Sequence, residues 1–309
     1  MNQLITQVSP HIFDKTTTQK IMLDVIIALC PAAVASVVLF GPRAALVIAV
    51  CVASCVLSEW LFEKICKRQN TISDLSAVVT GIMLAFNLPV DIQIWQAVFG
   101  SVAAIIVVKQ LFGGIGKNFA NPAITARIIM LISFPAAMSN WTLPNGVDIA
   151  SSATPLSIMQ GISEGELPSI TNMLLGLRGG SIGETCAAAL LLGGIYLIIR
   201  KVISWHTPVA FIGTVFLFTW ILGSNPVYHV LSGGLLLGAI FMATDYATTP
   251  YTKAGKLIFG IGCGILTVLI RVWGSYPEGV SFSILMMNIL TPYINKLTAS
   301  KPFGGVKAQ

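Results

Sequence analysis

Long apolar runs separated by short polar breaks dominate this chain of 309 residues. A membrane crossing needs roughly 20 mostly apolar residues, and division at glycines, prolines and charge clusters predicts ten such segments. They cover residues 21–40, 44–62, 75–88, 93–112, 122–139, 181–200, 207–223, 227–244, 255–273 and 280–295. The pattern therefore predicts an all-α polytopic membrane protein with about ten transmembrane helices.

Two of these segments contain interruptions. Segment 75–88 offers only the apolar run from Ser76 to Asn87, which is short for a regular crossing. Segment 227–244 contains Ser232-Gly233-Gly234, and glycine weakens a helix interior. We expect both helices to be interrupted.

The two halves of the chain resemble each other. The run from Gly81 to Asn87 compares with the run from Gly238 to Asp245. Each half has five predicted crossings, and an odd number reverses the orientation of the second half, which predicts a 5+5 inverted repeat. The predicted domains are the first repeat (1–139), a long loop (140–180) and the second repeat (181–309). Chance similarity between apolar helices is the alternative.

Composition and charge place the chain in a membrane. Hydrophobic residues make up 55% of it, charged residues only 10%, and the mean hydropathy is +0.84. Too few polar groups remain to cover a globular surface. Residues 1–20 are polar and lack the apolar core of a signal peptide, so the first helix is expected to be the first anchor.

The distribution of basic residues predicts the orientation. With a cytoplasmic N-terminus, the cytoplasmic side collects fifteen of the 18 Lys and Arg residues, and only Arg43, Arg178 and Arg271 fall elsewhere. Both termini are then cytoplasmic, and the 140–180 loop lies on the outer face. The basic pI of about 9.1 reflects these anchors, and no basic run is dense enough to indicate nucleic-acid binding.

The six cysteines predict no metal centre built by this chain alone, because no CxxC or Cys/His cluster occurs. Cys51 and Cys55 lie one turn apart in an apolar segment and are expected to be small packing residues.

The long loop carries a small polar run, Asp148-Ile-Ala-Ser151-Ser152-Ala153-Thr154, followed by Pro155. Thr154 before a proline is typical of a helix start, with Thr154 as the N-cap and Pro155 at the first helical position. The amides at such a start would also hold a phosphate group.

Two further motifs combine turn chemistry with polar side chains. Residues 113–123 connect the fourth and fifth segments and place Asn118 and Asn121 on one face of a turn. Their amides are suited to the edge of a flavin ring, which presents donors and acceptors. Thr244 and Asp245 follow the glycine-rich eighth segment. A plain helix connector and a solvated helix end are the alternatives.

Together these motifs resemble the flavinylated membrane subunits of ion-translocating oxidoreductases. That family includes RnfD of the Rnf complex, a ferredoxin:NAD oxidoreductase, and NqrB of the sodium-pumping NADH:quinone reductase. The resemblance covers nearly the whole chain. About 20 residues before the first helix favour the Rnf type over the quinone-reductase type, which typically has a longer N-terminal extension. Ser152 stands where the family usually has Gly.

The resemblance implies several cofactors and partners. Thr154 would carry FMN through a phosphoester bond made by a separate flavin transferase, with Asp148, Ser151, Ser152 and Ala153 forming its recognition motif. A noncovalent riboflavin near Asn118, Asn121, Thr244 and Asp245 is also implied. The subunit would have no catalytic residues of its own and would act in the bacterial cytoplasmic membrane. Its partners would be the membrane subunits RnfA and RnfE, the flavinylated RnfG and the iron–sulfur subunits RnfB and RnfC.

Ionisable residues inside predicted membrane segments or at their ends are candidates for coupling electron transfer to Na⁺ or H⁺ movement. They are Asp24, Glu59, Lys109, Arg127, Glu184 and Asp245. The alternative is that these side chains extend to the membrane boundary. A different function, a small-solute channel or transporter of the ammonium or urea type, would also fit a 5+5 repeat but would carry no covalent flavin.

Overall fold

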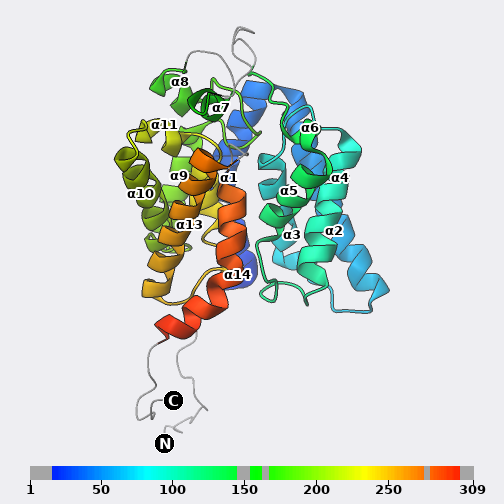
Figure 1. Cartoon of the computed structure of the whole chain (residues 1–309). Helices are drawn as coiled ribbons and strands as arrows, with labels where there is room; N and C mark the ends of the chain where they lie inside the picture. The colour runs from blue at the N-terminus through cyan, green and yellow to red at the C-terminus, as the bar shows by residue number, and fades with distance from the viewer. Residues whose placement is uncertain (1–15, 145–153, 162–166, 275–278, 300–309) are drawn as a thin grey trace, which may run out of the picture.

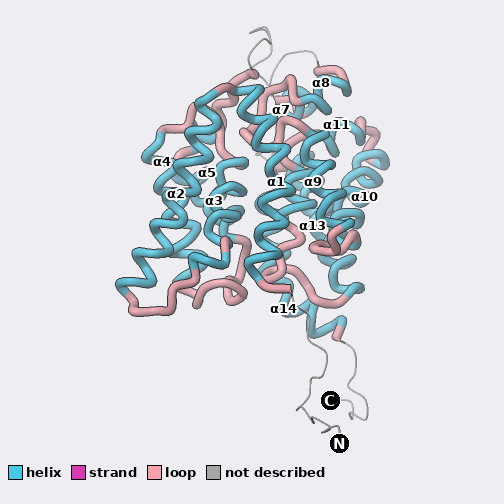
Figure 2. Tube along the Cα trace, turned by 180° about the vertical axis from the view of Figure 1, so that it is seen from behind, coloured by secondary structure: helices cyan, strands magenta, loops and turns pink. Residues whose placement is uncertain are grey.

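The computed structural model describes residues 16–144, 154–161, 167–274 and 279–299, and within these ranges every regular element is a helix (Figure 1; Figure 2). The predicted all-α class is confirmed. Three described helices are long and apolar enough to cross a membrane by length and composition: α1 (Thr18–Phe40), α2 (Pro42–Ile65) and α13 (Lys253–Trp273).

Each of the ten predicted segments contains helix. The other elements are η1 (Ile72–Asp74), α3 (Ser76–Phe86), α4 (Ile94–Val102), the π-helix η2 (Ala103–Gln110), α5 (Pro122–Ser133), α6 (Pro135–Met138), α7 (Pro155–Met159), α8 (Ile170–Leu175), α9 (Ala187–Ile199), α10 (His206–Ile221), α11 (Pro226–Leu231), α12 (Leu235–Leu237), the π-helix η4 (Gly238–Met242) and α14 (Val280–Thr298).

Proline starts several of these helices. Pro42, Pro122, Pro155 and Pro226 occupy the first helical position of α2, α5, α7 and α11. The first amide of a helix has no intrahelical partner, so proline at this position removes no hydrogen bond, and its fixed φ suits the helix. Gly41, with φ +75°, ends α1 directly before Pro42 and lets the chain reverse into α2.

Both predicted interruptions are confirmed. Helix α3 has only 11 residues. Segment 227–244 is broken near its middle, where Gly233 and Gly234, at φ +64° and +65°, separate α11 from α12. Residues with side chains rarely adopt these positive φ values, so the glycine pair fixes the position of the break.

The predicted segment 181–200 begins before the helix that it contains. Residues 181–186 are not helical, and α9 begins only at Ala187. The backbone amides of Ile182 and Gly183 instead donate to Leu88 O and Phe86 O, at 3.0 Å each. A Cβ on Gly183 would lie 2.1 Å from Phe86 Cγ, so only glycine permits this approach. Pairing with the end of α3 therefore replaces the helical hydrogen bonds that the prediction expected here.

Among the described helices, two pairs make the most extensive packing between the halves of the chain. Helix α1 packs on α9, and α5 packs on α14, while α2 packs on α3 and α4, and α10 packs on α11 and α13. Large apolar side chains on the outer surface stay exposed, among them Val38 (74%), Ile199 (73%) and Ile221 (78%). Helices α7 and α8 lie at the top of Figure 1, and α1 begins at the opposite end of the bundle.

Candidate functional site

Thr154 begins the short helix α7, and its predicted capping role is confirmed. Its Oγ1 accepts the Ser157 amide hydrogen at 3.3 Å and donates to Ser157 Oγ at 3.2 Å. The side chain is half-buried. Helix α7 has only five residues, so its dipole contributes little to holding a phosphate. The rest of the predicted attachment motif lies outside the described residues, and its roles stay predictions: Asp148, Ser151, Ser152 and Ala153.

Helix α7 rests on the break between α11 and α12. A Cβ on Gly233 would lie 2.3 Å from Leu156 Cδ1, which shows how closely the two segments pack. Gln160 Nε2 donates to Arg271 O. The Arg271 guanidinium donates to His229 O at 2.6 Å and to Ser232 O at 2.9 Å. Arg271 is 1% exposed, so it supports the broken helix from inside, a role that the charge count alone does not indicate.

A pocket at the other end of the bundle is lined by both halves of the chain. Asn118, Asn121, Thr244 and Asp245 all border it, together with Met22 near the start of α1. Its empty space is about 770 Å³, including the mouth that opens to solvent. The structure thus brings together two motifs that are more than a hundred residues apart in sequence.

Asn121 has a structural role as well as a place in the pocket wall. Its Oδ1 caps α5 by accepting the amides of Ala123 and Ile124, at 3.0 and 3.3 Å. Its Nδ2 lies 3.5 Å from Met242 O, the outer limit of a hydrogen bond. The Nδ2 donor of Asn121 therefore forms only a weak hydrogen bond, whereas its Oδ1 acceptor is already used to cap α5.

Asn118 is buried beside the same pocket, and its Nδ2 donates to Ala120 O at 3.1 Å. The turn therefore brings both Asn residues to one pocket, as its spacing predicts.

Asp245 contributes a carboxylate from the second half. Its Oδ1 accepts from the Ala247 amide at 3.4 Å, and its Oδ2 accepts from Thr248 Oγ1 at 3.3 Å. The Thr244 hydroxyl donates to Ile240 O at 2.6 Å and stays able to accept. Since Asp245 is half-buried in the pocket wall, it is not a fully solvated helix end.

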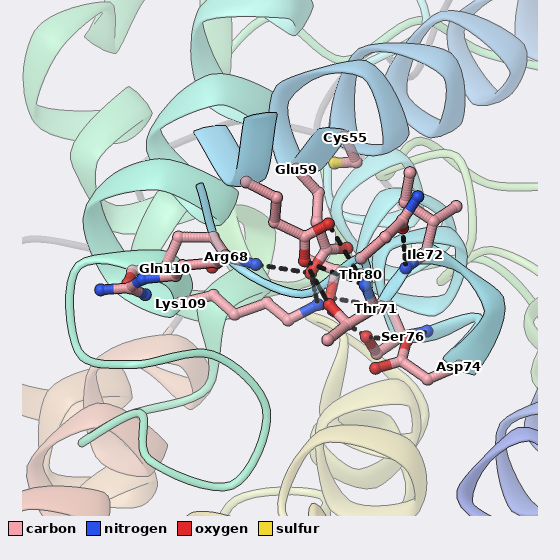
Figure 3. Close-up of polar contacts among 12 residues, drawn as sticks. Cys55, Glu59, Arg68, Thr71, Ile72, Asp74, Ser76, Thr80, Lys109 and Gln110 are labelled. Carbon is pink, nitrogen blue, oxygen red and sulfur yellow. Dashed lines mark hydrogen bonds and ion pairs between the residues drawn. The ribbon is translucent and has the colours of Figure 1, made fainter. Parts of the chain in front are cut away.

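The pocket wall also contains residues that its two motifs do not reveal. Ser76 and Lys109 add polar groups, and Val79 and Phe241 add apolar surface. Lys109 forms a buried ion pair with Glu59, with 2.7 Å between Nζ and Oε1 (Figure 3). The Lys109 and Glu59 side chains are only 3% and 0% exposed. The alternative that these two side chains extend to the membrane boundary is therefore wrong.

Other ionisable residues are also held inside the bundle. The buried Asp24 forms an ion pair with Arg200, with 3.3 Å between Asp24 Oδ2 and Arg200 Nη2. Arg127 donates to Asn87 Oδ1 at 2.9 Å and is buried, so it is not a surface charge on the cytoplasmic side. Glu184 accepts from Ser181 Oγ at 2.8 Å.

The cysteines agree with a packing role. Cys51 and Cys55 are both fully buried, and neither forms a disulfide.

Helical elements with long apolar stretches, a buried ion pair and a pocket bordered by both halves of the chain define an integral membrane protein. The chain belongs to the NQR2, RnfD, RnfE family, whose model matches residues 5–304. The resemblance predicted from the motifs is confirmed.

Three relatives illustrate the family. The chain is 46% identical to the D subunit of the Na(+)-translocating ferredoxin:NAD(+) oxidoreductase complex of Acetobacterium woodii, covering 99% of this chain and 98% of the relative. It is 44% identical to the D subunit of the proton-translocating ferredoxin:NAD(+) oxidoreductase complex of Clostridium ljungdahlii, covering 96% and 95%. It is 34% identical to the D subunit of the ion-translocating oxidoreductase complex of Escherichia coli O7:K1, covering 96% and 97%.

These relatives are subunits of an ion-translocating oxidoreductase complex, and two of them are named for different coupling ions. Their nearly equal identities to this chain do not favour either ion.

Proposed function

We propose that this chain is the membrane electron-transfer subunit of an Rnf-type ferredoxin:NAD oxidoreductase, with covalent FMN on Thr154 and noncovalent riboflavin in the pocket. The observation that carries the proposal is the convergence of Asn118, Asn121, Thr244 and Asp245 on one pocket. Its separation from α7, which lies at the opposite end of the bundle from the start of α1, supports two separate flavin sites (Figure 1).

The surroundings of Thr154 fit a phosphoester. Its hydroxyl is half-buried and donates its hydrogen only to Ser157 Oγ among the described residues. Replacing that hydrogen with a phosphoryl group costs one weak hydrogen bond, while Oγ1 stays in place beside the Ser157 amide. A flavin transferase would make this bond during maturation by transferring FMN from FAD to Thr154 Oγ1, which would lose its proton, with AMP as the leaving group.

The pocket fits the chemistry of a flavin ring. Val79 and Phe241 provide apolar walls for a flat ring, whereas Asn118, Asn121 and Asp245 provide donors and acceptors for its polar edge. A bound flavin supplies one-electron chemistry that no side chain here provides, and the protein supplies its position and electrostatic environment.

Two flavins at opposite ends would make the chain a path for electrons through the membrane. The proposed partners are the membrane subunits RnfA and RnfE, the flavinylated RnfG and the iron–sulfur subunits RnfB and RnfC. Electron transfer through them would be coupled to Na⁺ or H⁺ movement. The names of the relatives support such a complex.

The proposed topology is a 5+5 inverted repeat of ten crossings in the bacterial cytoplasmic membrane, with both termini cytoplasmic and the Thr154 loop on the outer face. Helix in every predicted segment supports this arrangement. An impermeant thiol reagent applied to intact cells should label Ser151→Cys and spare Lys307→Cys. The parent chain for both variants should lack the exposed native thiols Cys30 and Cys66. Labelling of Lys307→Cys alone would reverse the topology.

The presence of covalent flavin tests the function directly. The denatured chain, produced together with the transferase, should fluoresce in a gel under ultraviolet light, and the peptide containing Thr154 should carry the mass of FMN. A chain without covalent flavin in the active complex would contradict the proposal and favour a small-solute transporter.

A further inference from the structure

A buried ion pair lies directly behind one wall of the pocket. Glu59 on α2 is 0% exposed and Lys109 on η2 is 2% exposed. Lys109 Nζ donates to Glu59 Oε1 at 2.7 Å and to Ser76 Oγ at 2.6 Å. Gln110 Nε2 also donates to Glu59 Oε1, at 2.7 Å. Figure 3 shows these side chains converging from three segments.

The two charges lie at different depths relative to the pocket. Lys109 and its partner Ser76 border the pocket, whereas Glu59 does not. The Lys109 side chain is therefore nearer to the pocket than the Glu59 side chain. Lys109 has three donors, and two of them are used by Glu59 and Ser76.

The local backbone is unusual at this position. Lys109 belongs to the π-helix η2, and Phe241 of the π-helix η4 lines the same pocket. Such π-helical segments occur frequently at functional sites. A buried ion pair contributes little to stability compared with apolar residues of similar volume, so stability alone gives no reason for its presence.

We propose that Lys109 sets the reduction potential of the flavin bound in this pocket, and that Glu59 moderates the effect. This inference rests on the proposed function. When the ring accepts one electron from a reduced iron–sulfur or flavin donor, no bond breaks and the ring gains one negative charge. A nearby ammonium favours that charge, and the more distant carboxylate opposes it with a smaller effect.

The arrangement predicts an order of potentials. Glu59→Gln removes the opposing charge and should raise the one-electron midpoint potential. Lys109→Gln leaves the buried carboxylate alone and should lower it. The double variant removes the nearer positive and the farther negative charge, so its potential should lie between those of Lys109→Gln and the unsubstituted pair. Lys109→Arg keeps the charge and should keep the potential.

The experiment uses the full-length chain with Thr154→Asn in detergent. This chain carries no FMN on Thr154, so only noncovalent flavin contributes to the measured potential. Mediated titration with dithionite gives the midpoint potential of each variant. Lys109→Gln should change the ratio of reduced to oxidised flavin about tenfold, or about 59 mV for one electron, and Glu59→Gln should change it by less in the opposite direction. A purely structural pair would change flavin content or thermal stability without opposite shifts in potential.

The outcomes separate this inference from the function on which it rests. Absence of riboflavin from the parent chain would defeat the proposed function, and this inference with it. Riboflavin that binds normally but shows equal potentials, or shifts of the same sign in both single variants, would defeat only the role of Lys109. If a single variant does not accumulate, the double variant decides, because it leaves no charge unpaired: a lowered potential supports the role, and an unchanged or raised one overturns it.

Discussion

The two ends of the bundle present their candidate residues in different ways. Thr154 belongs to one continuous stretch and starts a five-residue helix. The pocket at the other end combines α3, η2, the turn before α5 and the chain after η4. A covalent bond needs one reachable hydroxyl and a local recognition sequence, whereas noncovalent binding needs several groups held together by the whole fold. The first site is therefore expected to tolerate changes elsewhere, and the second is not.

The largest expected effect comes from Thr154→Asn. Asparagine keeps the N-cap of α7 but has no hydroxyl to esterify. Covalent flavin should disappear completely, while the thermal midpoint changes little. Gel fluorescence of the denatured chain measures the loss, and Thr154→Ser is the matched control that keeps a hydroxyl. Fluorescence that persists in Thr154→Asn would place the attachment elsewhere.

A smaller effect is expected from the pocket amides. Asn121→Asp keeps an oxygen that caps α5 but removes the amide donor, whereas Asn121→Ala removes both. Loss of one hydrogen bond to a buried ring should cost about 1–3 kcal/mol, which corresponds to roughly tenfold or more in affinity.

Titration of the purified chain with riboflavin measures that affinity for Asn118→Ala and Asn121→Asp. Normal affinity in the combined variant would reduce these residues to a helix connector.

An effect of similar size, on stability instead of flavin binding, is expected in the segment between the two ends. Gly183→Ala places a Cβ against Phe86 and should destabilise the chain by about 1–3 kcal/mol. Gly213→Ala in α10 meets nothing within 4 Å and is the matched control, which should be neutral or slightly stabilising. Thermal midpoints in one detergent measure both. Equal midpoints for the two variants would contradict the close packing of residues 181–184.

The sequence predicts local features of this molecule well. The helix start at Thr154, the break at Gly233-Gly234 and the short third helix depend on neighbouring residues, so capping and turn chemistry indicate them. The placement of Asn118 and Asn121 on one turn follows from their spacing.

Contacts between distant segments are harder to predict. The pairing of residues 182–183 with the end of α3 joins chain segments that hydrophobic periodicity treats separately, and it delays the start of α9 to Ala187. The ion pair of Glu59 and Lys109 spans fifty residues, and no local pattern distinguishes it from two boundary charges. The pocket itself depends on the packing of both halves.

The central claim is that two flavins are held at opposite ends by independent means, and a crossed count of flavin tests it most directly. Acid extraction releases noncovalent flavin, while FMN esterified to Thr154 stays with the protein. Thr154→Asn should lose only the resistant flavin, and the variant with Asn118→Ala and Asn121→Asp should lose only the extractable flavin. Loss of both classes in either variant at an unchanged thermal midpoint, or no extractable flavin in the unsubstituted chain, would contradict the account.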